Sequence, residues 1–242
     1  MLFEIRTLYG DTRLGYLWAL VKTAFGVVSL LILRIISHAR APHGISSIAF
    51  LLLGFMIWQI FSQTVNKTMN AVRNNRNFLT FPQIFPLDII IARTLVIIAT
   101  EVVCAAILFA IFTMLGLMKD FYVANILLLM ASIFGSAFFG IGFGTICLAL
   151  SRYFPAVFQI VPLFLRIFFF ASGIFFSVAT FSHKFGTWLL YNPVMQFVEM
   201  SRHAIAYSYP IYYDFDYLAM VLLPLLTIGL LFERYIRRFE LQ

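Results

Sequence analysis

The side chains suited to acid–base or metal chemistry are few and scattered along this chain. Histidines can act as general bases or metal ligands, and neighbouring carboxylates can bind a cation; the candidates are His38, His43, His183 and His203, with Asp214 and Asp216. All lie outside or at the edges of long apolar stretches, without an H-E-x-x-H or G-x-S-x-G pattern. We predict no catalytic residue and no metal site, and keep an intramembrane enzyme as the remote alternative.

A glycine-rich run at 140–145 invites comparison with a phosphate-binding loop. Such a loop needs G-x-x-x-x-G-K-[ST], in which the lysine reaches the phosphates, and no lysine lies near these glycines. Small residues spaced four apart instead favour close packing of membrane helices, which suits Gly135, Ser136, Gly140 and Gly144. We therefore expect no cofactor on this chain. Any ATP-driven work would depend on a nucleotide site in another polypeptide.

Ionisable residues inside apolar stretches are costly and often functional. Glu101 is the deepest of them and follows Arg93 by about two helical turns. Lys22, Arg34 and Arg166 lie nearer the ends of their stretches, where long side chains can reach the interface. A negatively charged polymer would favour such cations along its path. These cations are explained at least as well by side chains that extend to the membrane interface, or by ion pairs with Glu101.

The residues named above must be positioned by membrane helices, as the composition of the chain indicates. Hydrophobic residues make up 62% of the 242 residues and charged residues 11%, with a mean hydropathy of +0.96. Soluble domains have roughly 45–50% apolar and about 25% charged residues. The net charge of +7 is ordinary for a membrane protein, so we predict no nucleic-acid partner. Cys104 and Cys147 lie in apolar runs and say little about the redox compartment.

The apolar stretches predict an all-α polytopic protein with about six spans, each needing about 20 apolar residues. The predicted spans are 15–36, 47–65, 88–117, 123–150, 156–178 and 217–235. One membrane domain then accounts for residues 1–242, with a polar segment at 66–87 and a semi-apolar insert at 179–216.

The distribution of Lys and Arg predicts the orientation, because cytoplasmic loops are enriched in them. With both termini on one side, that side collects Arg6, Arg13, Lys67, Arg73, Arg76, Arg93, Arg152, Arg234, Arg237 and Arg238. The other side collects Arg40, Lys119, Lys184 and Arg202. We therefore predict cytoplasmic termini and an outward-facing insert at 179–216.

Two segments on the predicted cytoplasmic side could receive a partner. Residues 1–14 have Leu2, Ile5 and Tyr9 on one helical face, which predicts an amphipathic helix in the membrane interface. In 66–87, apolar residues recur at near-helical spacing until Pro82 ends any helix. This segment is either a short helix that transmits force from a docked ATPase, or a solvated loop whose cations obey the inside rule.

The predicted outward insert contains a second short helix. Asn192 can cap a helix whose first residue is Pro193, and the segment to about residue 206 is too short to span. Glu199 and Arg202, three residues apart, can pair on one face of it. It is either a re-entrant or surface helix that gates an exit, or an interfacial helix that caps the bundle. Tyr207, Tyr209, Tyr212 and Tyr213 follow, as interfacial anchors or glycan contacts.

Three blocks resemble the permease subunits of ABC-2-type exporters of capsular polysaccharide and O-antigen. They are Glu4-Ile5-Arg6-Thr7-Leu8-Tyr9-Gly10 with Arg13-Leu14-Gly15-Tyr16-Leu17-Trp18-Ala19, then Pro86-Leu87-Asp88-Ile89-Ile90-Ile91-Ala92-Arg93, then the segment from Asn192-Pro193 to Glu199 and Arg202. Their order agrees with that family over nearly the whole chain. Lys22-Thr23 departs from its common Glu-Pro and Gln196 from its frequent His, which leaves polymer preference open.

The resemblance implies a homodimeric, multi-pass permease in a bacterial inner membrane that moves a lipid-linked capsular polysaccharide. ATP and Mg would be bound by separate nucleotide-binding subunits, docked on Arg6, Tyr9, Arg13, Lys67, Arg73, Arg76 and Phe81. A weaker expectation places the translocation path at Lys22, Trp58, Arg93, Glu101 and Arg166, although the place of Trp58 near a predicted interface favours the aromatic belt over the path. A periplasmic gate would contain Asn192, Pro193, Glu199 and Arg202 and meet a polysaccharide co-polymerase or adaptor. O-antigen, teichoic acid, another glycolipid or a small drug are alternative cargoes, and a membrane scaffold without transport is a further alternative.

Overall fold

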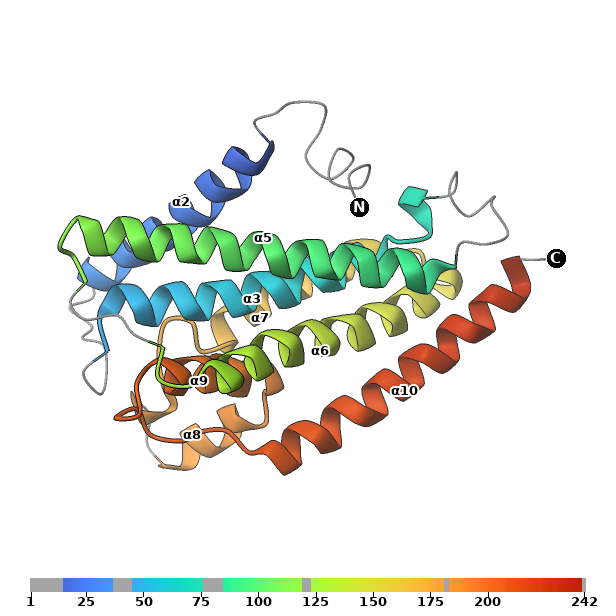
Figure 1. The fold of residues 1–242 in the computed structure, drawn as a ribbon. Coiled ribbons are helices and arrows are strands. Elements are labelled where there is room, and N and C mark those ends of the chain that lie inside the picture. The colour runs from blue at the N-terminus through green and yellow to red at the C-terminus, as the bar shows by residue number, and fades with distance from the viewer. Residues whose placement is uncertain (1–14, 37–44, 76–84, 119–122, 181–182, 241–242) are drawn as a thin grey trace.

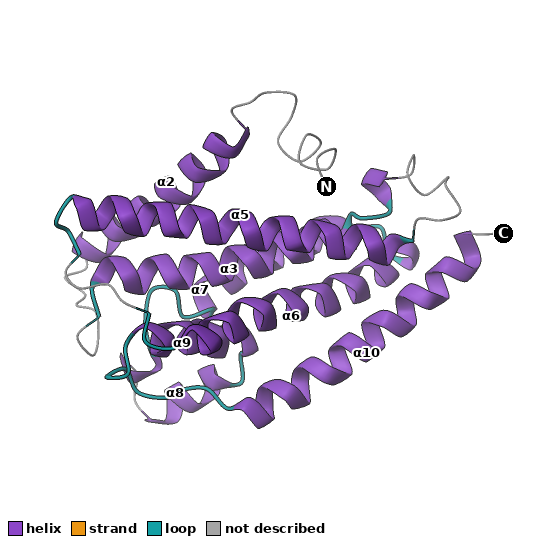
Figure 2. Ribbon diagram, viewed as in Figure 1, coloured by secondary structure: helices purple, strands orange, loops and turns teal. Residues whose placement is uncertain are grey.

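A computed structural model describes residues 15–36, 45–75, 85–118, 123–180 and 183–240, and all regular structure in them is helical (Figures 1 and 2). This confirms the predicted all-α class. The α-helices are α2 (Gly15–Ile36), α3 (Ser47–Met69), α5 (Pro86–Met114), α6 (Ile126–Tyr153), α7 (Val157–Ala171), α8 (His183–Leu190), α9 (Pro193–Ile205) and α10 (Phe215–Glu240). Two short 3-10 helices are η2 (Arg73–Asn75) and η3 (Val178–Thr180).

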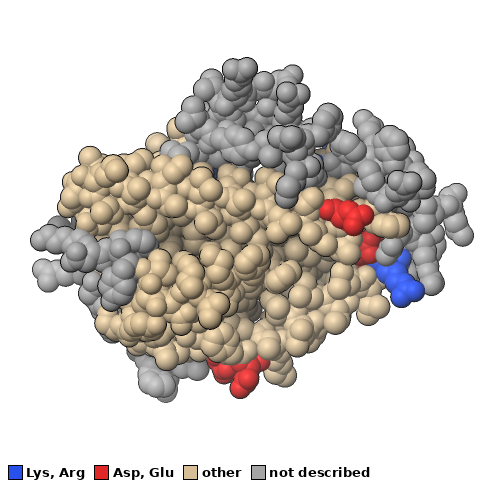
Figure 3. Space-filling view, in the orientation of Figure 1, with Lys and Arg blue, Asp and Glu red and all other residues tan. Residues whose placement is uncertain are grey.

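Four helices of the described chain, α3, α5, α6 and α10, are long and apolar enough to cross a membrane. Shorter apolar helices lie at Val21–Ile32 within α2 and at Val157–Ala171. The long helices lie roughly side by side, and α3 and α6 run antiparallel to α5 (Figure 1). In the space-filling view, the middle of the visible face carries no Lys, Arg, Asp or Glu among the described residues (Figure 3). Such a surface suits a lipid environment.

Helix starts follow local polar signals in the sequence. Ser46 and Asn125 precede α3 and α6, and their side chains accept hydrogen bonds from the amides of Ala49 (3.2 Å) and Leu128 (3.0 Å). Pro86 is the first residue of α5, where a missing amide hydrogen costs nothing. These bonds satisfy backbone donors that a helix cannot pair internally.

Several helix ends differ from the predicted spans by two to seven residues, and those of α3 and α7 have a clear local cause. Helix α3 passes the predicted end at residue 65 and reaches Met69. The side chains of Asn66 and Asn70 donate to the carbonyls of Ser62 (2.8 Å) and Asn66 (2.9 Å), so these polar residues are accommodated in the last turn. Lys67 therefore lies on α3 itself and not on a separate short helix. A turn and η2 follow it.

Helix α7 ends before the predicted boundary at residue 178. The side chain of Ser172 donates to the carbonyl of Phe168 (2.7 Å), and Gly173 has a φ of +72°. Positive φ is easily adopted only by glycine, so the chain leaves the helix at this point. The rest of the predicted fifth span forms a loop toward η3.

Helix α3 is the central element of the core. It packs against α2, α5, α6, α7 and α9, and most of its residues are buried. Phe50, Ile57, Phe61 and Val65 are at most 2% exposed. Helix α10 packs mainly on α6 and leaves most of its apolar surface outward. Exposed apolar side chains also line α5 and α7.

The small residues of α6 bring this helix close to α3, as the sequence predicted. A Cβ built on Gly140 would lie 3.1 Å from the carbonyl oxygen of Phe61, and one on Gly144 would lie 2.7 Å from the Cβ of Thr68. No side chain fits at these positions without moving α3. The glycines therefore serve helix packing.

Replacing Gly144 by Leu should destabilise the protein by roughly 1–3 kcal/mol, because overpacking forces the helices apart. The expected observation is a lower thermal unfolding temperature of the detergent-purified protein. Ala131→Leu is the matched control, since Ala131 lies on the exposed face of the same helix. Equal unfolding temperatures for the two variants would contradict the close α3–α6 packing.

Candidate functional site

The first candidate site is centred on α9. The side chain of Asn192 accepts from the amide of Val194 (3.0 Å) and donates to the carbonyl of Ala171 (2.9 Å), and Pro193 begins the helix, as predicted. Almost every residue of α9 is buried, against α3 and α6. It is thus an internal helix and not a surface one. The predicted pair is confirmed, with Arg202 Nη1 at 3.1 Å from Glu199 Oε1 and both side chains 0% exposed.

Arg202 joins this helix to the loop that follows α7. Its Nη2 donates to the carbonyl oxygens of Gly173 (2.8 Å) and Ile174 (3.1 Å), and its Nη1 to that of Phe176 (3.3 Å). The guanidinium carbon lies 3.4 Å from the centroid of the Phe50 ring on α3, a cation–π geometry. Burial lowers the pKa of Arg202, and the carboxylate of Glu199 opposes that shift. One side chain thus holds α9, α3 and the loop together.

The other oxygen of Glu199 receives a second set of donors. The hydroxyl of Tyr209 donates to Glu199 Oε2 at 2.5 Å, and it lies 2.6 Å from Ser177 Oγ. Ser177 Oγ also donates to Oε2, at 3.4 Å, whereas the amide of Val178 donates at 3.4 Å to Oε1, the oxygen that faces Arg202. Burial raises the pKa of Tyr209, which keeps its phenol protonated as a donor. We call Ser177, Glu199, Arg202 and Tyr209 the Arg202 cluster. His203 is also engaged, with Nδ1 2.5 Å from the carbonyl oxygen of Tyr209.

A second candidate site is a groove of about 510 Å³ between α3 and α7, which we call the Arg166 groove. Helix α3 contributes Trp58, Ser62 and Asn66, which follow one another at four-residue spacing and so share a face. Helix α7 contributes Pro162, Leu165, Arg166, Phe169 and Phe170. The structure therefore brings Trp58 and Arg166 together, as expected for two path residues. Sequence analysis missed Ser62 and Asn66, although their spacing from Trp58 was a usable signal.

Trp58 and Arg166 have different surroundings within this groove. Trp58 is 5% exposed, midway along α3, and its ring packs against those of Phe61 and Phe169 (centroids 5.6 Å apart in each case). A buried position midway along a helix long enough to span differs from that of a residue in an interfacial aromatic belt. Arg166 is exposed and forms no hydrogen bond or ion pair with the described residues, which removes the alternative of pairing with Glu101.

The other expected path residues lie on a different side of α3. Glu101 of α5 is 4% exposed and accepts a hydrogen bond from the side-chain amide of Gln63 at 2.5 Å. Lys22 of α2 lies within electrostatic range of this carboxylate and of Lys67. Arg93 is 7% exposed and also lies within range of Lys67. These residues form a polar cluster between α2, α3 and α5, separate from the Arg166 groove.

The predicted docking residues are only partly described. Arg6, Tyr9, Arg13, Arg76 and Phe81 lie outside the described residues. Lys67 is half-buried in the last turn of α3, and Arg73 is exposed in η2. The guanidinium of Arg73 lies 5.3 Å from the ring centroid of Phe158 in α7, a contact that the sequence did not reveal. The same end of the bundle carries the last turns of α6 and α10 (Figure 1). We call it the Lys67 end.

Comparison with known proteins gives a consistent set of similarities. The family model described as "ABC-2 type transporter" matches residues 2–206. The chain is 33% identical over 233 residues to the polysialic acid transport protein KpsM of Escherichia coli, covering 96% of this chain and 89% of that protein. It is 25% identical over 232 residues to the capsule polysaccharide export inner-membrane protein CtrC of Neisseria meningitidis serogroup B (94% and 85% covered). It is 22% identical over 228 residues to the corresponding protein BexB of Haemophilus influenzae (94% and 85%).

Proposed function

The chain belongs to the ABC-2 type transporter family, and from this premise we propose that it is the membrane-spanning subunit of an exporter that moves a capsular polysaccharide across a bacterial inner membrane. The observation that carries the proposal is the 33% identity with a polysialic acid transport protein over 96% of this chain. The all-helical architecture and the apolar surface support it.

The energy source in this proposal is a separate nucleotide-binding subunit that holds ATP and Mg. In the proposal it docks at the Lys67 end, on Lys67 and Arg73, and the proposed interface also includes Arg6, Tyr9, Arg13, Arg76 and Phe81. The contact between Arg73 and Phe158 supports a mechanical role, because a push on η2 would reach α7 directly. Both chain termini then lie in the cytoplasm, and α9 lies at the periplasmic end.

The path for the polymer requires two copies of the chain in this proposal. The exposed apolar face of α7, with Leu163, Ile167 and Phe170, suits a partner helix as well as lipid. A two-fold dimer would place two Arg166 grooves about one axis. Each groove offers what a glycan needs in a membrane: a cation, hydrogen-bonding groups on Ser62 and Asn66, and aromatic rings. The gate is assigned to α9 with Asn192, Pro193, Glu199 and Arg202.

Arg73→Glu should release the nucleotide-binding subunit while the permease still inserts. The substitution places a carboxylate where the proposed interface has cations and removes the contact with Phe158. We expect about a tenfold loss of co-purified nucleotide-binding subunit and loss of export. Arg73→Lys is the control, since it keeps the charge. Co-purification of the partner at wild-type levels with Arg73→Glu would contradict the docking model.

The proposed function is tested by deleting the gene and restoring it from a plasmid. We expect loss of surface polysaccharide, accumulation of the polymer inside the cell, and recovery on complementation. The chemical composition of the internal pool identifies the cargo, whether capsule, O-antigen or teichoic acid. Normal surface polysaccharide without an internal pool would contradict polysaccharide export by this chain.

A further inference from the structure

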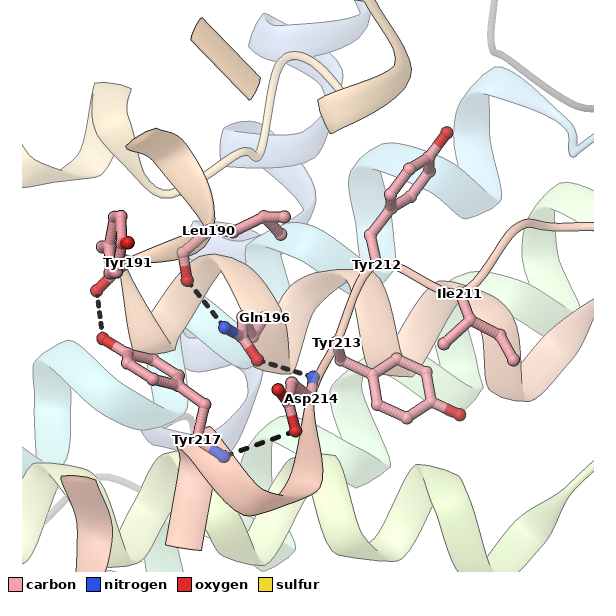
Figure 4. Close-up of a pocket in the computed structure, with 8 residues that line it drawn as sticks. All are labelled: Leu190, Tyr191, Gln196, Ile211, Tyr212, Tyr213, Asp214 and Tyr217. Atoms are coloured by element: carbon pink, nitrogen blue, oxygen red, sulfur yellow. Dashed lines mark hydrogen bonds between the residues drawn. The ribbon is translucent and has the colours of Figure 1, made fainter. Parts of the chain in front are cut away.

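A separate pocket of about 290 Å³ lies at the end of the molecule where α9 begins (Figure 4). Four tyrosines contribute to its walls, which come from the end of α8, the first turns of α9 and α10, and the segment between these last two helices. The lining residues are Leu190, Tyr191, Gln196, Ile211, Tyr212, Tyr213, Asp214 and Tyr217. We call it the tyrosine pocket. It is distinct from the Arg166 groove and from the Arg202 cluster.

Hydrogen bonds between the walls fix the shape of the tyrosine pocket. The side chain of Gln196 donates to the carbonyl of Leu190 (2.6 Å) and accepts from the amide of Asp214 (2.9 Å). The hydroxyl of Tyr217 donates to the carbonyl of Tyr191 (2.7 Å). Gln196 thus joins α8 to the segment before α10. The pocket is formed in advance, as small-molecule sites usually are.

Several polar groups at this site are left for a ligand. Within the described residues, the hydroxyls of Tyr212 and Tyr213 make no hydrogen bond, and Asp214 uses Oδ1 alone, for the amides of Asp216 (2.9 Å) and Tyr217 (3.4 Å). Burial raises the pKa of Tyr213, so its phenol remains a neutral donor. Tyr191 is 63% exposed and offers an aromatic surface. In Figure 4, Tyr191 and Tyr217 lie on one side of Gln196 and Asp214, and Tyr213 lies on the other.

These features select a small ligand with an apolar face and several hydroxyl donors. The volume is at the lower limit of small-molecule pockets, roughly 300 Å³, and so suits one sugar ring better than a longer segment. Tyrosine combines an apolar ring with a polar end and can contact both faces of such a unit. The carboxylate of Asp214 only accepts hydrogen bonds, which favours hydroxyl groups and disfavours another carboxylate.

We propose that the tyrosine pocket binds one hydroxyl-rich sugar unit of the exported glycan as the polymer leaves the permease. This inference rests on the proposed function and adds an exit-side contact for the same polymer. The pocket holds the sugar against the exposed ring of Tyr191, with Asp214 accepting from its hydroxyl groups. A contact of this kind slows backward movement of the chain at the outer end.

The test is photo-crosslinking in living cells that make the polymer, with Ile211 replaced by p-benzoylphenylalanine. Ile211 lines the pocket, is 63% exposed, and leaves all four tyrosines in place. The probe is the polysaccharide that the host strain itself synthesises. The crosslinking residue is then combined with Tyr191→Ala. This substitution removes the ring but keeps the backbone carbonyl that accepts the hydrogen bond of the Tyr217 hydroxyl. Trp188→Ala is the control: Trp188 is an exposed aromatic residue of α8, the helix that ends just before Tyr191, and it does not line the pocket although its ring lies against that of Tyr191 (centroids 6.3 Å apart).

We expect a glycan adduct that disappears when polymer synthesis is blocked. Tyr191→Ala should lower its yield about fivefold, as the loss of one aromatic contact predicts, whereas Trp188→Ala should preserve it. Surface polysaccharide measured in the same cells separates the possible failures. Three outcomes would overturn the proposed sugar binding by the pocket and leave the proposed function intact. They are normal export without an adduct, an adduct to protein in place of glycan, and equal adduct yields in the two variants. Absence of export with the wild-type chain would overturn both.

Discussion

Arg202→Ala is expected to be the most damaging single substitution in the described part of the chain. It removes the guanidinium from three loop carbonyls and the Phe50 ring, and it leaves Glu199 as an unpaired carboxylate at 0% exposure. Removing one partner of a buried ion pair costs about 3–5 kcal/mol. That is a large fraction of a typical folding free energy of about 5–15 kcal/mol. We therefore expect strongly reduced protein levels and loss of export.

The measurement is thermal unfolding of the purified protein, with Arg202→Lys and the double variant Glu199→Ala/Arg202→Ala as controls. Lysine keeps the charge but lacks the planar fork, so it should give an intermediate unfolding temperature. The double variant should be more stable than the sum of the two single losses predicts, because it leaves no unpaired carboxylate. An Arg202→Ala variant that unfolds at the wild-type temperature would refute the stabilising role of the Arg202 cluster.

Arg166→Gln should have the opposite profile, with normal stability and impaired export. Arg166 is exposed and forms no hydrogen bond or ion pair with the described residues, so its removal breaks no such interaction among them. A hydrogen bond to a charged group is worth about 1.5–3 kcal/mol, which corresponds to a loss of tenfold or more in export rate if the polymer contacts this side chain. Arg166→Lys should retain most of the export. The rate is measured as the appearance of surface polymer after induction.

The comparison with Arg202→Ala makes this result decisive, because the two variants separate transport from folding. Normal export by Arg166→Gln at wild-type abundance would remove the Arg166 groove from the polymer path. Reduced abundance would assign Arg166 a structural role instead. Polymer that accumulates inside the cell in proportion to the missing surface polymer is the expected outcome.

Local signals made several elements predictable from the sequence. Asn192-Pro193 marks the start of α9 because capping and the absence of a proline amide act over neighbouring residues. The α6 glycines predicted close packing because their four-residue spacing exposes backbone along one face. The Glu199–Arg202 pair followed from helical spacing alone.

Long-range contacts explain what the sequence did not reveal. Arg202 reaches the carbonyl oxygen of Phe50, which is 152 residues away, and no spacing rule predicts that contact. The early end of α7 depends on the Ser172–Phe168 bond and the backbone of Gly173, within a stretch that is apolar throughout. The partner of Arg73 is a phenylalanine on α7, which an analysis of charge pattern alone does not select.

The contacts between Arg202 and the loop after α7 have a consequence for how this protein can evolve. The guanidinium recognises main-chain oxygens at Gly173, Ile174 and Phe176, and every amino acid supplies the same oxygen. The side chain at 176 can therefore vary among homologues without losing this anchor, whereas Ile174, which is 0% exposed, is also held by the core. The length of the loop cannot, because one inserted or deleted residue would shift all three oxygens out of reach. Alignments of relatives should show a variable residue at 176, an apolar residue at 174 and an invariant spacing between them and Gly173.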